Sequence, residues 1–136
     1  MTTIKTKPRV LIVDDVPGNI KALSVLLRED CHIVMATSGQ IALKAVASQD
    51  IDLILLDIEM PEMDGYEVCR RLHSNPESED IPVIFVTAQS EVQDEAHGLE
   101  LGAVDYITKP VTPSILKARV KTQLTLKEPF TLSATY

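Results

Sequence analysis

The sequence predicts an α/β protein whose core is a five-stranded, doubly wound parallel sheet in a (βα)5 arrangement. Five short apolar runs alternate with five stretches in which apolar residues recur at helical spacing. This alternation is typical of right-handed crossovers that place helices on both faces of a parallel sheet. Five strands are too few to close an eight-stranded barrel. We therefore expect an open sheet with the flavodoxin-like strand order 2-1-3-4-5.

The polarity of each apolar run indicates where its strand lies in the sheet. The runs at 10–13, 53–56 and 83–86 are continuously apolar and rich in branched side chains. Such runs are expected for central strands that are covered on both faces. The runs at 32–36 and 104–107 are shorter or more polar, which is typical of edge strands.

The predicted helices follow from apolar residues that fall on one face. Gly102 suits a left-handed end to the fourth helix, and Thr112 with Pro113 suits the start of the fifth. The expected helices span 17–30, 39–48, 65–74, 90–101 and 113–126. The domain that these elements form is expected over 9–126, between an N-terminal extension at 1–8 and a C-terminal tail at 127–136.

Length and charge restrict the classes of protein to which the chain can belong. Its 136 residues, 45% hydrophobic and 24% charged, are enough for one domain with its own core. Twenty acidic and 13 basic residues give a net charge of −7, which argues against direct binding of nucleic acid. Neither a membrane-spanning run nor a signal peptide is found, so we expect a cytoplasmic protein that makes no membrane contact. Cys31 and Cys69 are expected to be buried and reduced.

Polar residues stand at the ends of four predicted strands. Asp14 and Asp15 follow the first strand, Asp57 the third, Thr87 the fourth, and Lys109 the fifth. Ligands of this fold bind beyond the carboxyl ends of the strands, between strands 1 and 3. Three carboxylates there repel one another, and Mg²⁺ together with a lysine would offset the repulsion. An aspartate nucleophile, a metal, an ammonium and a hydroxyl are the parts needed for phosphoryl transfer to a carboxylate.

Each of these residues also has a plainer interpretation. Asp14 or Asp15 could cap the following helix, Thr87 could be an ordinary strand residue, and Lys109 could be a solvated surface lysine. Their joint placement at successive strand ends favours the functional interpretation.

The chain resembles the receiver domain of two-component response regulators over about residues 9–126. The resemblance is carried by VLIVDD at 10–15, LILLDIEMPEMDGYEV at 53–68, PVIFVTA at 82–88 and GAVDYITKP at 102–110. It implies that Asp57 accepts a phosphoryl group from a histidine kinase, a phosphotransfer protein or a small phosphodonor. The stretches VDDVPGNIKAL at 13–23 and KARVKTQL at 117–124 look most like receivers joined to cyclic-dinucleotide enzymes.

The same resemblance assigns roles within the site. The protein is then no enzyme in the usual sense but a regulatory phosphoacceptor that catalyses its own phosphorylation and dephosphorylation through Asp57, Thr87 and Lys109. The implied Mg²⁺ ligands are the side chains of Asp15 and Asp57 and the backbone carbonyl of Glu59, while Asp14 helps to hold the ion, often through a water. The Lys109–Pro110 peptide bond is expected to be cis.

A conformational switch is implied as well. Thr87 would move towards the phosphoryl group and let the ring of Tyr106 turn inward; the alternative is that Tyr106 only packs. The surface formed by the predicted elements at 90–101, 104–107 and 113–126 would then change, and so control an output domain, a partner or a homodimer.

The rate at which water removes the phosphoryl group is a separate property. The resemblance implies that Glu59 and Gln89, which lie two places beyond Asp57 and Thr87, tune this rate by orienting the attacking water. The sequence leaves no room for an effector after the last helix, so we expect the output on a missing C-terminal domain or on a separate protein.

Three alternatives remain open from the sequence. A haloacid-dehalogenase-type phosphatase would use an aspartate nucleophile and Mg²⁺, but it needs a second aspartate where this chain has Glu59. A flavodoxin-like FMN carrier would cradle a phosphate in the loop at 14–19, whose two carboxylates repel it. A receiver that binds partners without phosphorylation would not need the full set of acidic, threonine and lysine residues.

Overall fold

A single parallel sheet forms the centre of the protein, and its strand order is β2-β1-β3-β4-β5. The computed structural model describes residues 7–88 and 92–127. The strands are β1 (Arg9–Val13), β2 (His32–Ala36), β3 (Leu53–Leu56), β4 (Val83–Thr87) and β5 (Asp105–Thr108). The predicted fold class and strand order are therefore confirmed.

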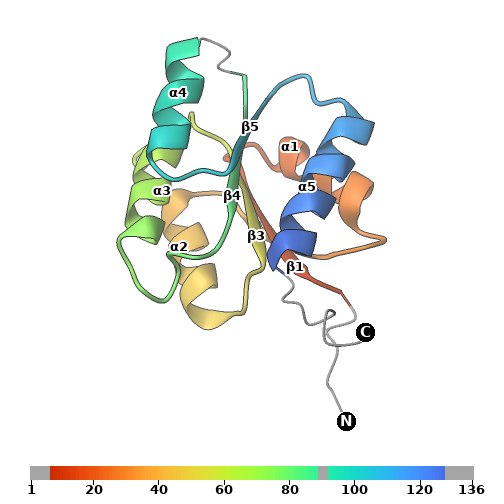
Figure 1. The fold of residues 1–136 in the computed structure, drawn as a ribbon, viewed down its shortest axis with the longest axis horizontal. Coiled ribbons are helices and arrows are strands. Elements are labelled where there is room, and N and C mark those ends of the chain that lie inside the picture. The colour runs from red at the N-terminus through yellow and green to blue at the C-terminus, as the bar shows by residue number, and fades with distance from the viewer. Residues whose placement is uncertain (1–6, 89–91, 128–136) are drawn as a thin grey trace.

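Helices cover both faces of this sheet. They are α1 (Pro17–Leu27), α2 (Gly39–Ser48), α3 (Gly65–His73), α4 (Val92–Glu100) and α5 (Pro113–Lys127). Figure 1 shows α1 and α5 on one face and α2, α3 and α4 on the other. This is the arrangement expected when the direction of winding reverses between β1 and β3.

The alternation of side chains along β1 divides the core into two layers. Val10 and Ile12 belong to the cluster that includes residues of α1 and α5. Leu11 and Val13 belong to the cluster that includes residues of α2 and α3. All four are fully buried, as predicted for a strand covered on both faces. The edge strand β2 is more open, and Met35 is 60% exposed there.

Several boundaries differ from the predicted ones by a few residues. Helix α1 ends at Leu27 rather than at 30, because the carbonyl of Leu27 accepts the amides of Asp30 and Cys31 in a turn that leads into β2. Strand β5 begins at Asp105, one residue later than expected, and the predicted helix residues 90 and 91 lie outside the described part of the chain. Gly102 has φ of 108°, which confirms the predicted left-handed end of the fourth helix.

Both cysteines are buried and have free thiols, as predicted. Burial raises the pKa of the Cys69 thiol to about 11, so this group is protonated at neutral pH. None of the helices in the described segments has the length and apolar character needed to cross a membrane.

Candidate functional site

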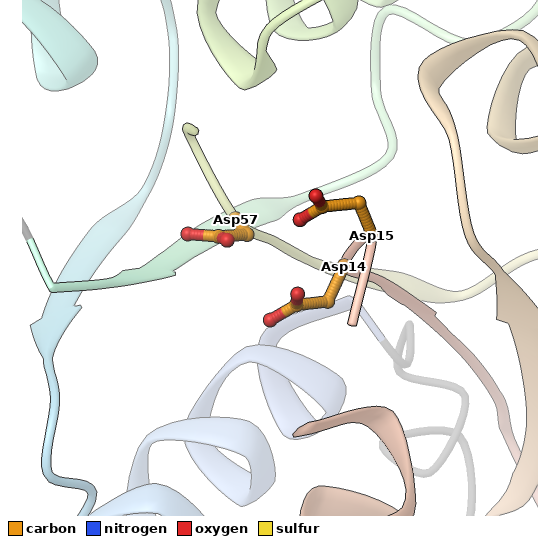
Figure 2. Close-up of side chains that lie close together, drawn as sticks. All are labelled: Asp14, Asp15 and Asp57. Carbon is orange, nitrogen blue, oxygen red and sulfur yellow. The ribbon is translucent and has the colours of Figure 1, made fainter. Parts of the chain in front are cut away.

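The carboxyl ends of β1 and β3 bring three aspartates together. Val13 and Leu56 are register partners in the two strands, so the residues that follow them lie side by side. Asp14, Asp15 and Asp57 each offer a carboxylate oxygen within 4.8 Å of the others. Figure 2 shows the three side chains pointing to the same side of the strand ends. The predicted acidic cluster is therefore present.

Asp14 is held firmly by three donors. Its Oδ1 accepts the amide of Val16 at 2.9 Å, and its Oδ2 accepts Nδ2 of Asn19 at 3.2 Å and Nζ of Lys109 at 3.0 Å. The residue is only 2% exposed. The plainer expectation that Asp14 or Asp15 is the N-cap of the next helix is wrong, because Val16 occupies that position without a side-chain cap.

Lys109 reaches the site from the loop that follows β5. Its backbone amide donates to the carbonyl of Thr87 at 2.8 Å, and its peptide bond to Pro110 is cis, as expected. The Nζ atom lies 3.0 Å from Oδ2 of Asp14 and 4.0 Å from Oδ2 of Asp57. Lys109 is therefore a member of the cluster and not a solvated surface lysine.

Opposing influences act on the carboxyl group of Asp57. Burial is the largest, and it raises the pKa of this carboxyl above its ordinary value. The Lys109 ammonium lowers the pKa, and the neighbouring Asp14 raises it. Hydrogen bonds from the Thr87 hydroxyl and from the Ile58 amide, 2.9 Å away, lower it further. Burial, together with repulsion from Asp14, therefore outweighs the influences that lower the pKa of Asp57.

The carboxylate oxygens of this cluster suit a hard divalent cation as ligands. Mg²⁺ prefers oxygen ligands, and one or two carboxylates usually suffice for it in proteins. Here three carboxylates converge, and Asp15 is the most exposed of them. A cation bound among them would add to the positive charge of Lys109.

Thr87 and Tyr106 lie on the neighbouring strands β4 and β5. Thr87 ends β4 and is fully buried. Tyr106 is 7% exposed, and its ring centroid lies 6.0 Å from that of Phe85. The ring of Tyr106 is therefore packed inside the protein in this structure.

Of the two residues predicted to tune loss of the phosphoryl group, Glu59 belongs to the described part of the chain. Glu59 is exposed and lines a shallow pocket of about 420 Å³ next to the loop that follows Asp57. Gln89 lies outside the described residues. Their role, and that of the Glu59 carbonyl as a metal ligand, stay predictions.

Sequence reasoning did not assign Asn19 or Tyr66 to the site region. An amide in the first turn of α1, five places after Asp14, could have indicated the bond between these two residues. Tyr66 was expected only as an apolar residue on one face of a helix. That pattern does not reveal that its hydroxyl donates a hydrogen bond to the backbone carbonyl of Asp94.

A model of the response regulator receiver domain matches residues 10–121. The chain belongs to this family. A probable cyclic di-GMP phosphodiesterase from Vibrio cholerae is 53% identical to this receiver over 115 residues. The match covers 85% of the chain but only 26% of that relative. The receiver thus spans about a quarter of the length of this relative, and the rest has no counterpart in the sequence given.

Solved receiver domains have the same fold. The receiver domain of a histidine kinase from Syntrophus aciditrophicus has a TM-score of 0.83 and 36% identity, with 90% of this chain and 93% of that chain covered. The receiver domain of a sensor histidine kinase from Pseudomonas aeruginosa has a TM-score of 0.80 and 26% identity, with 88% and 98% covered. That second structure contains a magnesium ion coordinated in its active-site cleft. Family membership favours the receiver over the phosphatase and the FMN carrier.

Proposed function

We propose that this receiver is a phosphorylation-dependent switch that takes a phosphoryl group onto Asp57 from a histidine kinase or a phosphotransfer protein. The observation that carries the proposal is the convergence of three carboxylates within 4.8 Å with Lys109 beside them. A buried acid next to a metal-binding cluster and an ammonium has the parts required for phosphoryl transfer. The domain that performs it spans 9–126.

The chemical step is an in-line displacement at phosphorus. A carboxylate oxygen of Asp57 forms a bond to the phosphorus atom of a phosphohistidine, and the bond from phosphorus to the imidazole nitrogen breaks. The nitrogen keeps the electron pair and takes a proton from solvent. The Thr87 hydroxyl and the Lys109 ammonium then lie close enough to bind the new phosphoryl oxygens.

Asp14, Asp15 and Asp57 would hold Mg²⁺, with the carbonyl of Glu59 as a further ligand. When bound, the ion neutralises negative charge that develops on the transferring group. Because Asp14 is already fixed by three donors, its carboxylate is positioned before any ligand arrives. Glu59, and Gln89 outside the described residues, would orient the water that later hydrolyses the acyl phosphate.

The phosphoryl group carries about −1.5 to −2 charge. Because it replaces the −1 charge of the ionised Asp57 carboxylate, it would add a net charge of about −0.5 to −1, together with three acceptor oxygens, beside Thr87 and Lys109. We infer that Thr87 moves towards this group. After Thr87 has moved, Tyr106 occupies the inward position that it has in this structure. The surface of α4, β5 and α5 is then the part of the molecule that changes. It carries the exposed apolar side chains of Leu99, Val104 and Ile115, which suit contact with a second copy or an output domain.

The relative from Vibrio cholerae suggests the kind of output. That relative is named a probable cyclic di-GMP phosphodiesterase, and this receiver matches 26% of its length. We therefore infer a cyclic-dinucleotide enzyme as the output domain of this receiver. We place the protein in the cytoplasm, where a histidine kinase would meet it.

The experiment that tests the switch is sedimentation with and without Mg²⁺ and beryllofluoride, a mimic of the phosphoryl group. We expect the mimic to increase the mass of the particle through the α4–β5–α5 surface. An unchanged mass at high protein concentration, in a sample shown to bind the mimic, would count against self-association and leave an output domain as the target of that surface.

A further inference from the structure

Tyr66 lies at a junction between α3, α4 and β4. Its ring meets that of Phe85 edge-on, with centroids 5.6 Å apart and an interplanar angle of 68°. It meets the ring of His97 in the same manner at 4.5 Å and 70°. Phe85 lies on β4, two residues before Thr87, and His97 lies on α4. One side chain of α3 therefore contacts both the strand that ends at the site and the helix next to it.

The hydroxyl of Tyr66 adds a polar contact to the same helix. It donates to the backbone carbonyl of Asp94 at 3.3 Å, in the first turn of α4. Burial, followed by the nearby carboxylates of Asp94 and Asp64, raises the pKa of Tyr66, which keeps the hydroxyl protonated and able to donate. The bond therefore ties the first turn of α4 to α3.

The same group of rings includes Tyr106. The ring of Phe85 packs against both tyrosines, with its centroid 5.6 Å from that of Tyr66 and 6.0 Å from that of Tyr106, and the side chains of the two tyrosines are hydrogen-bonded to each other. Gly98 allows this packing, because a Cβ there would lie 2.9 Å from the Phe85 ring. The inward position of Tyr106 and the docked position of α4 thus share one set of contacts, to which Tyr66 adds its contacts with His97 and with the carbonyl of Asp94.

We propose that Tyr66 is a positioning residue for the switch, and that its hydroxyl stabilises the conformation in which Tyr106 is buried and α4 is docked against α3. This inference rests on the proposed function, in which that conformation accompanies phosphorylation. A ligand that favours one of two conformations binds less tightly when that conformation is made rarer. Loss of the hydroxyl must therefore weaken binding of a phosphoryl mimic at Asp57, although Tyr66 is not one of the groups proposed to bind it.

The test uses Tyr66→Phe, which removes the hydroxyl and keeps the ring against Phe85 and His97. The concentration of beryllofluoride that half-saturates the protein in the presence of Mg²⁺ should rise roughly 2- to 10-fold, the range expected for one net hydrogen bond. Amide hydrogen exchange over residues 94–100 should accelerate by a similar factor. The matched control is Ser74→Ala, which removes a hydroxyl that bonds to the carbonyls of Arg70 and Arg71 within the same region. The control should change neither quantity.

Two outcomes separate this inference from the proposed function. If the unaltered protein binds beryllofluoride but Tyr66→Phe binds it equally well and exchanges equally slowly over α4, the role of Tyr66 is refuted and the switch stands. If the unaltered protein does not bind the mimic, the proposed function has failed.

A third variant, Tyr66→Leu, removes the ring as well and should weaken binding of beryllofluoride further than Tyr66→Phe does. Equal binding by the two variants would contradict the role of the ring contacts.

Discussion

The ammonium of Lys109 lies 3.0 Å from Oδ2 of Asp14, although 95 positions separate the two residues in the sequence. The side chain of Asp14 is 3% exposed and that of Lys109 is 25% exposed. Asp57 is further away, at 4.0 Å. In this structure, therefore, Lys109 mainly neutralises Asp14, and it stays within reach of groups attached to Asp57.

Substitution of Lys109 by Met should destabilise the protein. Asp14 would lose one of its three donors while remaining buried, and the pKa of Asp57 would rise further because the influence that lowers it most is gone. We expect a loss of roughly 1–3 kcal/mol in the free energy of unfolding, measured by urea denaturation at pH 7. Lys44→Met, at an exposed position of α2, should change it by less than about 0.5 kcal/mol. Equal losses in both variants would show that the pair contributes nothing specific.

Asp57→Asn should stabilise the protein at neutral pH. The raised pKa of Asp57 means that the folded state binds this proton more tightly than the unfolded chain does, so the ionised carboxylate costs stability at pH 7. The amide of asparagine has nearly the same shape and no charge, so this cost is removed and the free energy of unfolding at pH 7 should increase.

The pH dependence of the stability difference between Asp57→Asn and the unaltered protein tests the direction of the pKa shift. As the pH falls through the raised pKa of Asp57 to below about 3.9, the ordinary value for aspartate, the carboxyl of the unaltered protein becomes protonated. The advantage of Asp57→Asn should then disappear. Thermal unfolding of both proteins between pH 3.5 and 7, with a difference that grew towards low pH, would contradict the pKa shift.

Magnesium should stabilise the protein through the acidic cluster. At a concentration tenfold above its dissociation constant, a ligand that binds only the folded state adds about 1.4 kcal/mol. We expect MgCl₂ to raise Tm accordingly and excess EDTA to reverse the rise. Asp15→Asn should abolish most of this response, whereas Asp50→Asn, an exposed acid outside the cluster, should retain it. Equal responses of the two variants would place the ion elsewhere.

Gly65 should not tolerate even a methyl group. A Cβ at this position would lie 2.2 Å from the carbonyl oxygen of Asp57 and 2.8 Å from Cα of Ile58, and these backbone atoms cannot move without displacing the site. Gly65→Ala should therefore cost about 3 kcal/mol or more. Gly18→Ala, where a Cβ would meet no atom within 4 Å, should be neutral or stabilising by up to about 1 kcal/mol. The comparison can be made by thermal unfolding, and equal stability of the two variants would contradict the close approach.

The fold could be predicted from the sequence because its physical signals are local. The continuous apolar runs of β1, β3 and β4 indicate strands covered on both faces, and the alternation with helices fixes parallel crossovers. The same topology brings Asp14 and Asp57 together, since residues that follow adjacent parallel strands must lie at one edge of the sheet.

The remaining features depend on side-chain geometry that no spacing rule provides. Lys109 Nζ lies 3.0 Å from Oδ2 of Asp14 and 4.0 Å from Oδ2 of Asp57. A sequence pattern cannot resolve this difference of 1.0 Å. Tyr66 satisfies an amphipathic pattern whether or not its hydroxyl finds an acceptor on another helix. Its bond to Asp94 depends on how α3 and α4 pack together, which the sequence pattern of either helix alone does not determine.

The most direct test of the central claim is the intact mass of the protein after incubation with acetyl phosphate and Mg²⁺. The account predicts the addition of a single phosphoryl group to the unaltered protein, no addition in the presence of excess EDTA, and no addition to Asp57→Asn. Asp57→Asn keeps the neighbouring Asp14 and Asp15, so it also shows whether another acid can accept the group. Full labelling of Asp57→Asn, or of the unaltered protein without a divalent cation, would contradict the account.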